Sequence, residues 1–230
     1  MELSEFYLMR TQMHNGKLTI AILGGTGDLG SALAIKWAQK GHTIIIGSRS
    51  KEKATNFARS MREELGLETI NGFELGEAAK LCDLAVLTVP YSSHEAILKT
   101  VKEFLQGKIL IDTTVPLQKE VTKVSLPKAG SAAVEAQNIL GDDVTVIAAL
   151  QNIGSHLLSS EDRIDAEVLI SGNNEAALNL VTELVEELGL GSWQVGPLEN
   201  SAAAEALTSI LIAINKKYKR KSSGIKITSH

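Results

Sequence analysis

A glycine-rich turn near the start of the patterned sequence has residue types and a spacing that could hold a phosphate group. Gly25, Gly27 and Gly30 form the pattern G-x-G-x-x-G within GGTGDLG. Such glycines permit a tight turn, let the backbone approach a pyrophosphate and let the next helix pack close to the strand. The pattern alone is weak, since any glycine-rich turn can match it. Here it lies between a predicted strand and a predicted helix, which favours a dinucleotide site with helix N–H groups facing the phosphates.

The residues about 20 positions further on indicate which dinucleotide would fit. NAD-specific domains carry an acid there for the ribose hydroxyl, whereas this chain has GSRSKEK. Ser48, Arg49 and Lys53 offer a hydroxyl, a guanidinium and an ammonium group to a 2′-phosphate, and Arg49 can also stack on adenine. A solvated helix start is the alternative interpretation, but cations at a helix N-terminus oppose its dipole. The segment therefore favours NADP(H) over NAD(H).

Two strand ends further along the chain should border the nicotinamide ribose. Leu87-Thr88-Val89-Pro90 and Val115-Pro116 end predicted strands, and ligands of open α/β sheets lie at the carboxyl ends of the strands. The alternative for Pro90 is that it only stops a strand.

The elements that must position these residues follow from hydrophobic periodicity. Short β-branched runs predict buried strands, and apolar residues at helical spacing predict helices between them. We expect strands over 18–23, 42–46, 69–73, 84–89, 108–111, 144–150, 166–171 and 193–195, and helices over 31–40, 51–65, 93–105, 131–140, 174–188 and 201–218. This alternation indicates an α/β fold with a doubly wound parallel sheet of the Rossmann type.

The regular alternation of predicted strands and helices is interrupted by a polar segment after residue 151, which suggests a second domain. We expect an N-terminal tail over 1–17, an NADP-binding Rossmann domain over 18–155 and a smaller C-terminal α/β domain over 156–230. Met13 is an alternative start, because the patterned sequence begins only at Leu18. Asn200 is placed to cap the final helix.

Composition limits the partners. The chain has 230 residues, 44% of them hydrophobic, so it can bury a sizeable core. A formal net charge of −4 gives no field for nucleic acid or an anionic membrane, and no apolar stretch reaches the ~20 residues of a membrane span. The single cysteine, Cys82, is expected to be buried, and the histidines lack metal-ligand spacing. We expect a cytoplasmic protein with small-molecule partners and no metal.

Five segments are recognisable together: IAILGGTGDLG, GSRSKEKA, CDLAVLTVP, GPLENS and LTSILIAINKKYKRKSSGIKIT. They resemble the NADPH-dependent reductases of coenzyme F420, from Leu18 nearly to the end of the chain. Because the N-terminal motifs occur in other Rossmann enzymes, the specific part is the pairing of SR-x-x-x-K with GPL-x-N-S and the final helix. The resemblance implies an oxidoreductase that transfers a hydride reversibly between C4 of the nicotinamide and C5 of the deazaflavin. A direct transfer between stacked rings requires no dedicated catalytic residue.

The resemblance also implies which residues bind each partner. NADP(H) would contact Thr26, Gly27, Asp28, Leu29, Ser48, Arg49, Lys53, Val89, Val115 and Ser155. The deazaflavin of the co-substrate F420 would lie near Pro90, Gln151, Asn152, Thr208 and Ile212. Part of the family carries His-Thr or His-Asn and then a small Pro-Ala element where this chain has QNIGS at 151–155. Gln151 still donates a hydrogen bond but cannot become cationic.

Further features of the sequence bear on the rim of the site and on assembly. Tyr91 either covers the nicotinamide face or lies at the rim, and His94 is interpreted as a polar residue in the first turn of a helix. The apolar stretch over 202–214 of the final helix predicts a homodimer. A basic cluster follows, which either complements the helix dipole or binds the phosphodiester and glutamyl tail of F420: Lys216, Lys217, Lys219, Arg220 and Lys221.

Two other functions stay open. One is an NADPH-dependent reductase of another acceptor, such as a flavin, a quinone or a ferric chelate, for which the change at Gln151 leaves room. The other is a non-catalytic protein that senses NADPH or binds a partner. Reductase turnover separates an enzyme from a sensor.

Overall fold

Eight strands form one sheet in the computed structural model, which describes residues 16–159 and 165–228. The order across the sheet is β3-β2-β1-β4-β5-β6-β7-β8, and every neighbouring pair is parallel except β6 with β7. The strands are β1 (Thr19–Leu23), β2 (Thr43–Ser48), β3 (Ile70–Glu74), β4 (Leu84–Leu87), β5 (Ile109–Asp112), β6 (Thr145–Ala148), β7 (Glu167–Gly172) and β8 (Gly191–Gln194). With β1 in the middle and later strands added outward, this is the predicted doubly wound Rossmann sheet.

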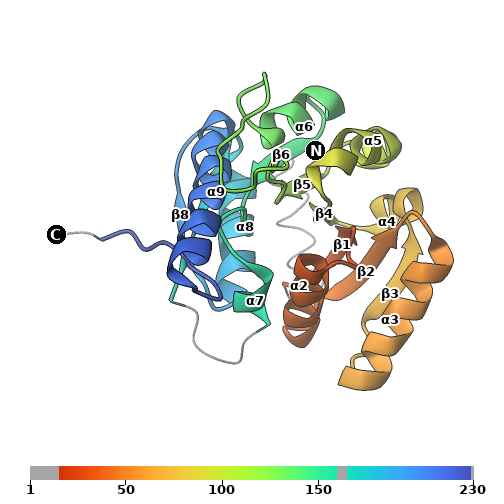
Figure 1. The fold of residues 1–230 in the computed structure, drawn as a ribbon. Helices are drawn as coiled ribbons and strands as arrows, with labels where there is room; N and C mark the ends of the chain where they lie inside the picture. The colour runs from red at the N-terminus through yellow and green to blue at the C-terminus, as the bar shows by residue number, and fades with distance from the viewer. Residues whose placement is uncertain (1–15, 160–164, 229–230) are drawn as a thin grey trace.

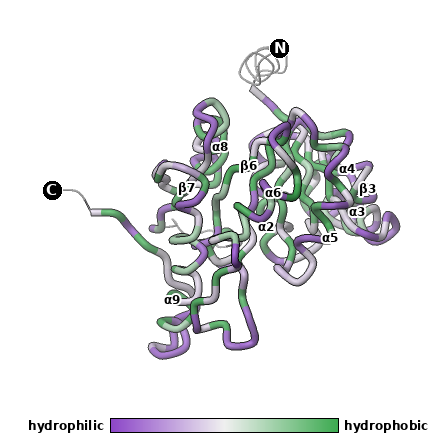
Figure 2. Tube along the Cα trace, turned by 90° about the horizontal axis from the view of Figure 1, so that it is seen from above, coloured by the Kyte–Doolittle hydropathy of each residue, from purple (hydrophilic) through white to green (hydrophobic). Residues whose placement is uncertain are grey.

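Helices cover both faces of the sheet (Figure 1). One face packs against α2 (Asp28–Gln39), α3 (Lys51–Leu65) and α8 (Glu175–Glu187), and the other against α4 (Leu75–Leu81), α5 (Tyr91–Val101) and α6 (Ala132–Leu140). The remaining helical elements are η1 (Lys102–Phe104), α7 (Ser155–Leu158), η2 (Leu198–Asn200) and α9 (Ser201–Tyr218). Figure 2 shows hydrophobic and hydrophilic stretches alternating along the helices, as expected for elements that are buried on one side.

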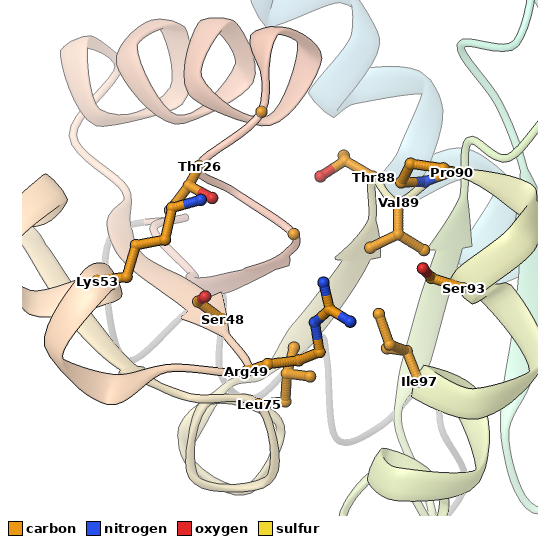
Figure 3. A pocket seen from close by; sticks show the side chains of 12 residues that line it. Thr26, Ser48, Arg49, Lys53, Leu75, Thr88, Val89, Pro90, Ser93 and Ile97 are labelled. Atoms are coloured by element: carbon orange, nitrogen blue, oxygen red, sulfur yellow. The ribbon is translucent and has the colours of Figure 1, made fainter.

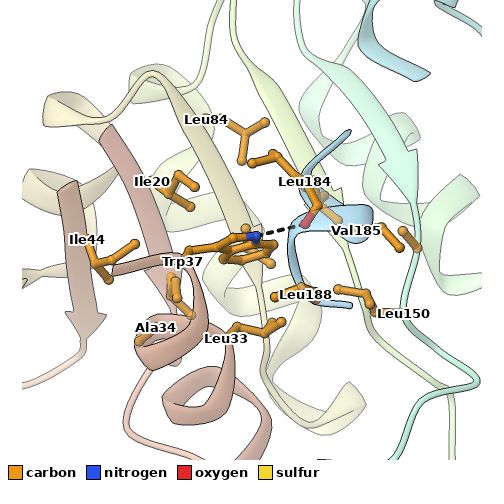
Figure 4. Packing of buried hydrophobic residues seen from close by; sticks show 14 of the residues in the cluster. Ile20, Leu33, Ala34, Trp37, Ile44, Leu84, Leu150, Leu184, Val185 and Leu188 are labelled. Atoms are coloured by element: carbon orange, nitrogen blue, oxygen red, sulfur yellow. Dashed lines mark hydrogen bonds between the residues drawn. The ribbon is translucent and has the colours of Figure 1, made fainter. Parts of the chain in front are cut away.

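Trp37 joins the N-terminal and C-terminal parts of the chain. Its indole is fully buried among aliphatic side chains (Figure 4), and Nε1–H donates a 2.9 Å hydrogen bond to the main-chain oxygen of Leu184 in α8. An unsatisfied buried N–H would cost about 1–3 kcal/mol. One apolar core therefore extends from β1 and α2 to α8.

Beyond residue 155 the chain extends the same sheet. β7 runs antiparallel to β6 and pairs with it only at Ile147–Gly172 and Ala148–Ser171, so most of β7 lies beyond the carboxyl end of β6. β8 follows in parallel with β7. Since the sheet and the core both continue past residue 155, no gap marks the division into domains 18–155 and 156–230, which stays a prediction.

Element boundaries differ from the expected ones in several places. α2 begins at Asp28 rather than at residue 31, because the turn before it is already closed by a bond from Gly27 N to Gly24 O. α5 begins at Tyr91 rather than at residue 93. The sequence did not indicate α4, which has only seven residues and therefore too few turns for a periodic pattern.

Asn200 does not cap α9, contrary to the expectation. Its backbone is already helical, as part of η2, and its side chain donates to the main-chain oxygen of Val195 at 2.6 Å. A capping residue needs an extended backbone to turn its side chain back onto the helix N–H groups. The short η2 helix before α9 therefore excludes the predicted cap.

Cys82 is buried after the end of α4, as predicted, and burial raises the pKa of its thiol to about 11. Among the helices of the described ranges, none combines the length and apolarity needed to cross a membrane. The expected N-terminal tail and the alternative start at Met13 lie outside the described residues, apart from positions 16 and 17.

Candidate dinucleotide site

A cavity of about 250 Å³ opens at the carboxyl ends of β1, β2 and β4. Its walls come from the turn between β1 and α2, from the start of α3 and from the first turns of α5 (Figure 3). The structure brings these predicted binding residues together around it: Thr26, Gly27, Ser48, Arg49, Lys53, Val89 and Pro90. The cavity therefore lies at the sheet edge where open α/β sheets bind ligands.

The glycine-rich turn fits closely between β1 and β4. A Cβ atom on Gly30 would lie 2.7 Å from the Cα atom of Gly25. A Cβ atom on Gly24, where φ is +90°, would lie 2.9 Å from the main-chain oxygen of Thr88. Because the obstructing atoms belong to the backbone, neither position accepts a side chain without a shift of the turn.

Gly27 serves a different purpose from its neighbours. A Cβ atom there would meet only the main-chain oxygen of Gly24, at 3.6 Å, which is ordinary van der Waals contact. The fold itself therefore does not require glycine at this position, although Gly27 lines the cavity. The absent side chain leaves space for a group that approaches the backbone, and a pyrophosphate at the N-terminus of α2 fits that space.

Two cations, Arg49 and Lys53, face the cavity from the wall opposite the glycine-rich turn. Arg49 follows the end of β2 and Lys53 lies in the first turn of α3, while Ser50 caps this helix by accepting a bond from the N–H of Lys53 at 3.2 Å. Figure 3 shows the Arg49 guanidinium pointing into the cavity, with Lys53 on the first turn of α3. Within the described residues, neither cation has a carboxylate at ion-pair distance, whereas the neighbouring Lys51 pairs with Glu77. Arg49 and Lys53 are therefore available to an anionic ligand.

Thr88, which belongs to the predicted strand end, also lines the cavity, and so do Leu75, Ser93 and Ile97, which the sequence reasoning missed. Leu75 is the first residue of α4, a helix that the sequence did not indicate. Ile97 belongs to the apolar residues at helical spacing in α5, and such spacing occurs on any buried side of a helix. The predicted residues Gly25, Asp28, Leu29 and Gly30 shape the turn and the first turn of α2 but do not line the cavity.

His94 on α5 and Asp112 at the end of β5 form a buried pair. His94 Nε2 lies 2.7 Å from Asp112 Oδ2, and the two side chains are 1% and 0% exposed. Asp112 Oδ1 also accepts the N–H of Thr114 at 2.9 Å. His94 lies in the first turn of α5, as predicted, but the prediction did not include its burial or its pairing with Asp112. Its partner lies at the end of β5, and local sequence does not reveal that proximity.

Tyr91 points away from the dinucleotide cavity. Its hydroxyl donates to Glu135 Oε2 at 2.7 Å, and it lines a separate cavity between α5 and α6. Burial, followed by the contact with Glu135, raises the pKa of Tyr91 to about 12. This geometry favours the interpretation of Tyr91 as a rim residue over a role in covering the nicotinamide.

The predicted deazaflavin residues Gln151 and Thr208 are in direct contact. The Thr208 hydroxyl donates to the main-chain oxygen of Gln151 at 2.7 Å, and Gln151 Nε2 donates to the main-chain oxygen of Asp112 at 2.9 Å. Asn152 Nδ2 donates to the main-chain oxygen of Glu167 at 2.7 Å. Gln151 Oε1 and Asn152 Oδ1 are buried without a hydrogen-bond partner. Six of the predicted binding residues do not line the dinucleotide cavity: Val115, Gln151, Asn152, Ser155, Thr208 and Ile212.

Glu205, which the sequence reasoning did not single out, lies one helical turn before Thr208 on α9. Its side chain is buried, and its carboxylate accepts the N–H groups of Ala132 and Ala133 at the start of α6, at 2.8 and 3.2 Å. Burial outweighs these two bonds and raises the pKa of Glu205 to about 8. Glu205 thereby fixes α9 against α6.

Known proteins resemble the chain over nearly its whole length. The family described as NADP oxidoreductase, coenzyme F420-dependent, matches residues 19–116. The F420-dependent NADP reductase of Methanocaldococcus jannaschii is 40% identical over 92% of this chain and 99% of its own length. The chain belongs to the family of F420-dependent NADP reductases. The reductase of Methanothermobacter marburgensis shares the same identity and coverage. A solved structure of an F420-dependent NADP-reductase from Arthrobacter covers 92% of this chain and 100% of its own, at 25% identity and a TM-score of 0.79.

Replacing Arg49 with alanine should weaken NADPH binding much more than NADH binding. The substitution removes a charge-assisted contact to the 2′-phosphate, so Kd for NADPH should rise about tenfold or more. Fluorescence titration of each nucleotide measures this without an acceptor. Lys51→Ala is the matched control, because Lys51 already pairs with Glu77. Equal losses for both nucleotides would show that Arg49 does not read the 2′-phosphate.

Replacing Glu205 with glutamine should flatten the pH dependence of stability. The pKa of Glu205 is about 8 in the folded chain against an ordinary value of 4.5, so between these values the folded chain binds more protons than the unfolded chain. The contribution of Glu205 is complete below about pH 4.5 and is lost as the pH rises through about 8.

Urea denaturation at several pH values across that window measures the effect. The wild-type free energy of unfolding should fall more steeply with rising pH than that of the Glu205→Gln variant. Glu183→Gln, on the exposed side of α8, should keep the wild-type slope. Parallel slopes for wild type and Glu205→Gln would contradict the raised pKa.

Proposed function

We propose that this chain transfers a hydride reversibly between NADP(H), bound in the cavity at the ends of β1, β2 and β4, and coenzyme F420 beside it. The observation that carries the proposal is the single cavity that joins a glycine-rich turn to two unpaired cations and to the end of β4. Membership of the F420-dependent NADP reductase family supports the choice of acceptor.

Different residues fit three parts of NADP(H): the pyrophosphate, the 2′-phosphate and the nicotinamide. Gly27 leaves space for the pyrophosphate, and Ser48, Arg49 and Lys53 supply donors and positive charge for the 2′-phosphate. Val89 and Pro90 would border the nicotinamide at the end of β4. We assign Asp28 and Leu29 to the first turn of α2 beneath the phosphates, and Val115 and Ser155 to contacts that form around the bound nucleotide.

The deazaflavin would lie between Pro90 and the segment after β6. Gln151 and Asn152 each keep one buried acceptor oxygen without a donor, and a ligand N–H would satisfy such an atom. Thr208 holds the main chain of Gln151, and Ile212 lies one helical turn further along α9. The neutral amide of Gln151 would therefore orient the ring by hydrogen bonding without a positive charge.

NADP(H) and F420 supply the hydride chemistry themselves when bound. The task of the protein is to hold two planar rings in contact and to keep water from the space between them. Leu75, Val89 and Ile97 give the cavity an apolar side suited to that exclusion. We assign no residue as a dedicated acid or base, and we propose no metal.

The first experiment is a turnover assay with purified protein, NADPH and oxidised F420, followed at the deazaflavin absorbance band. NADPH should bleach F420 rapidly, whereas NADH should bleach it much more slowly, and FMN should not replace F420. Tight NADPH binding without bleaching would contradict F420 as the acceptor. Turnover of FMN, a quinone or a ferric chelate would then identify a different reductase, and no turnover at all would indicate a sensor.

We also propose a homodimer in the cytoplasm, formed through α9. Ile210, Ile214 and Tyr218 follow one another at intervals of four residues and are 48%, 37% and 61% exposed, so they form an apolar stripe along one side of the helix. A second copy of the same stripe would cover it with two-fold symmetry. The domain division near residue 155 would then separate the nucleotide-binding part from the part that carries this surface.

Light scattering tests the dimer. The wild-type mass should be twice that of the chain, and the double substitution Ile210→Glu and Ile214→Glu should give a monomer that keeps its circular dichroism spectrum. A wild-type protein that scatters as a monomer would refute the proposed interface.

A further inference from the structure

The end of α9 carries a group of cations in a chain whose formal net charge is −4. We call this group the basic turn: Lys216, Lys217, Lys219, Arg220 and Lys221. All of its side chains are exposed, and within the described ranges none of them has a carboxylate at ion-pair distance. Figure 2 shows the end of α9 as hydrophilic. Among the described residues, the basic turn is therefore a concentrated positive charge without a carboxylate partner.

The dipole of α9 accounts for only part of this charge. Lys216 and Lys217 lie in the last helical turn, where cations are favourable. Lys219, Arg220 and Lys221 come after the helix has ended, and the dipole effect falls off within the last turn. Three consecutive cations beyond the helix therefore point to an anionic partner rather than to stabilisation of the helix.

The backbone of the basic turn is held in a defined place. Lys219 adopts the left-handed conformation, with φ at +53°, and Arg220 N donates to the main-chain oxygen of Asn215 at 3.0 Å. The Ser223 hydroxyl then donates to Asn215 Oδ1 at 2.7 Å. Two residues later the main-chain oxygen of Ile225 accepts the N–H of Glu167 at 3.0 Å, which fastens the segment to β7.

The basic turn also lies beside the segment that we assign to the deazaflavin. The Ser222 hydroxyl oxygen would be only 2.9 Å from a Cβ atom on Gly154, so the chain after α9 passes close to Gly154. From Thr208, which bonds to Gln151, to Lys217 the helix advances about 13 Å. The cations therefore lie about two helical turns and a half beyond Thr208, a distance that the extended tail of a bound co-substrate can span.

We propose that the basic turn binds the anionic tail of F420, the phosphodiester and glutamyl carboxylates that follow its ribityl chain. The inference rests on the proposed F420 function. The ring would enter between Pro90 and Gln151, and the tail would leave the site across Gly154 to reach Lys217 and Arg220. Lysine and arginine supply the point charge and the bidentate donors that phosphate and carboxylate groups accept.

The test compares F420 with its tail-less 8-hydroxy-5-deazaflavin nucleoside, which presents the same ring. In the double variant Lys217→Ala and Arg220→Ala, KM for F420 should rise about three- to tenfold, as expected for the loss of two exposed charge contacts. The kcat value, KM for NADPH and KM for the tail-less substrate should not change. The matched control is Lys40→Ala with Lys80→Ala, which removes the same charge at helix ends on the opposite edge of the sheet and should leave all four values unchanged.

Ionic strength provides an independent readout. Added salt should raise the wild-type KM for F420 and leave KM for the tail-less substrate constant, and the double variant should lose that difference. Equal KM values of the wild type for the two substrates, or equal shifts in the variant, would overturn the subsite while leaving the F420 activity in place. Failure of the wild type to reduce either substrate would instead refute the proposed function.

Discussion

The close approach of α2 to the sheet is the constraint on which the ligand edge depends. At Gly30 even one methyl group would collide with the backbone of Gly25, and at Gly24 it would collide with the carbonyl of Thr88 at the end of β4. Because both side chains are absent, the N-terminus of α2 comes within reach of Val89 and Pro90, which follow β4. A single cavity can then include the helix N–H groups and the end of β4 together. A wider spacing would separate the phosphate-binding part from the ring-binding part.

Asp112 holds together the segments on the side of the site that we assign to the deazaflavin. Its side chain contacts His94 on α5 and the N–H of Thr114, and its main-chain oxygen accepts from Gln151. Gln151 in turn contacts Thr208 on α9. Three segments that are distant in the sequence therefore meet at one buried residue. Removing either partner of such a buried pair leaves a charge or a polar group without compensation, so the positions of these segments are coupled.

Features that depend on a short-range sequence pattern could be predicted, whereas side-chain pairs that depend on tertiary contacts could not. Buried strands show as continuous apolar runs, and Ser48, Arg49 and Lys53 lie at a fixed distance from the glycine-rich turn, so the sheet and the phosphate side of the cavity could be predicted. His94 and Glu205 could not, because their partners at Asp112 and at the start of α6 lie in other elements. Leu75 was missed because α4 is too short to show a helical period.

The buried thiol of Cys82 can report how often α4 separates from the sheet. The thiol is buried, and its pKa of about 11 keeps it protonated at neutral pH, so a thiol-specific reagent finds no reactive thiolate in the folded state. Modification must proceed through molecules in which α4 has separated from the sheet. A nucleotide that binds only the folded chain reduces that population in proportion to its occupancy. The rate at which this one sulfur reacts is therefore a measure of ligand affinity that needs neither an acceptor nor turnover.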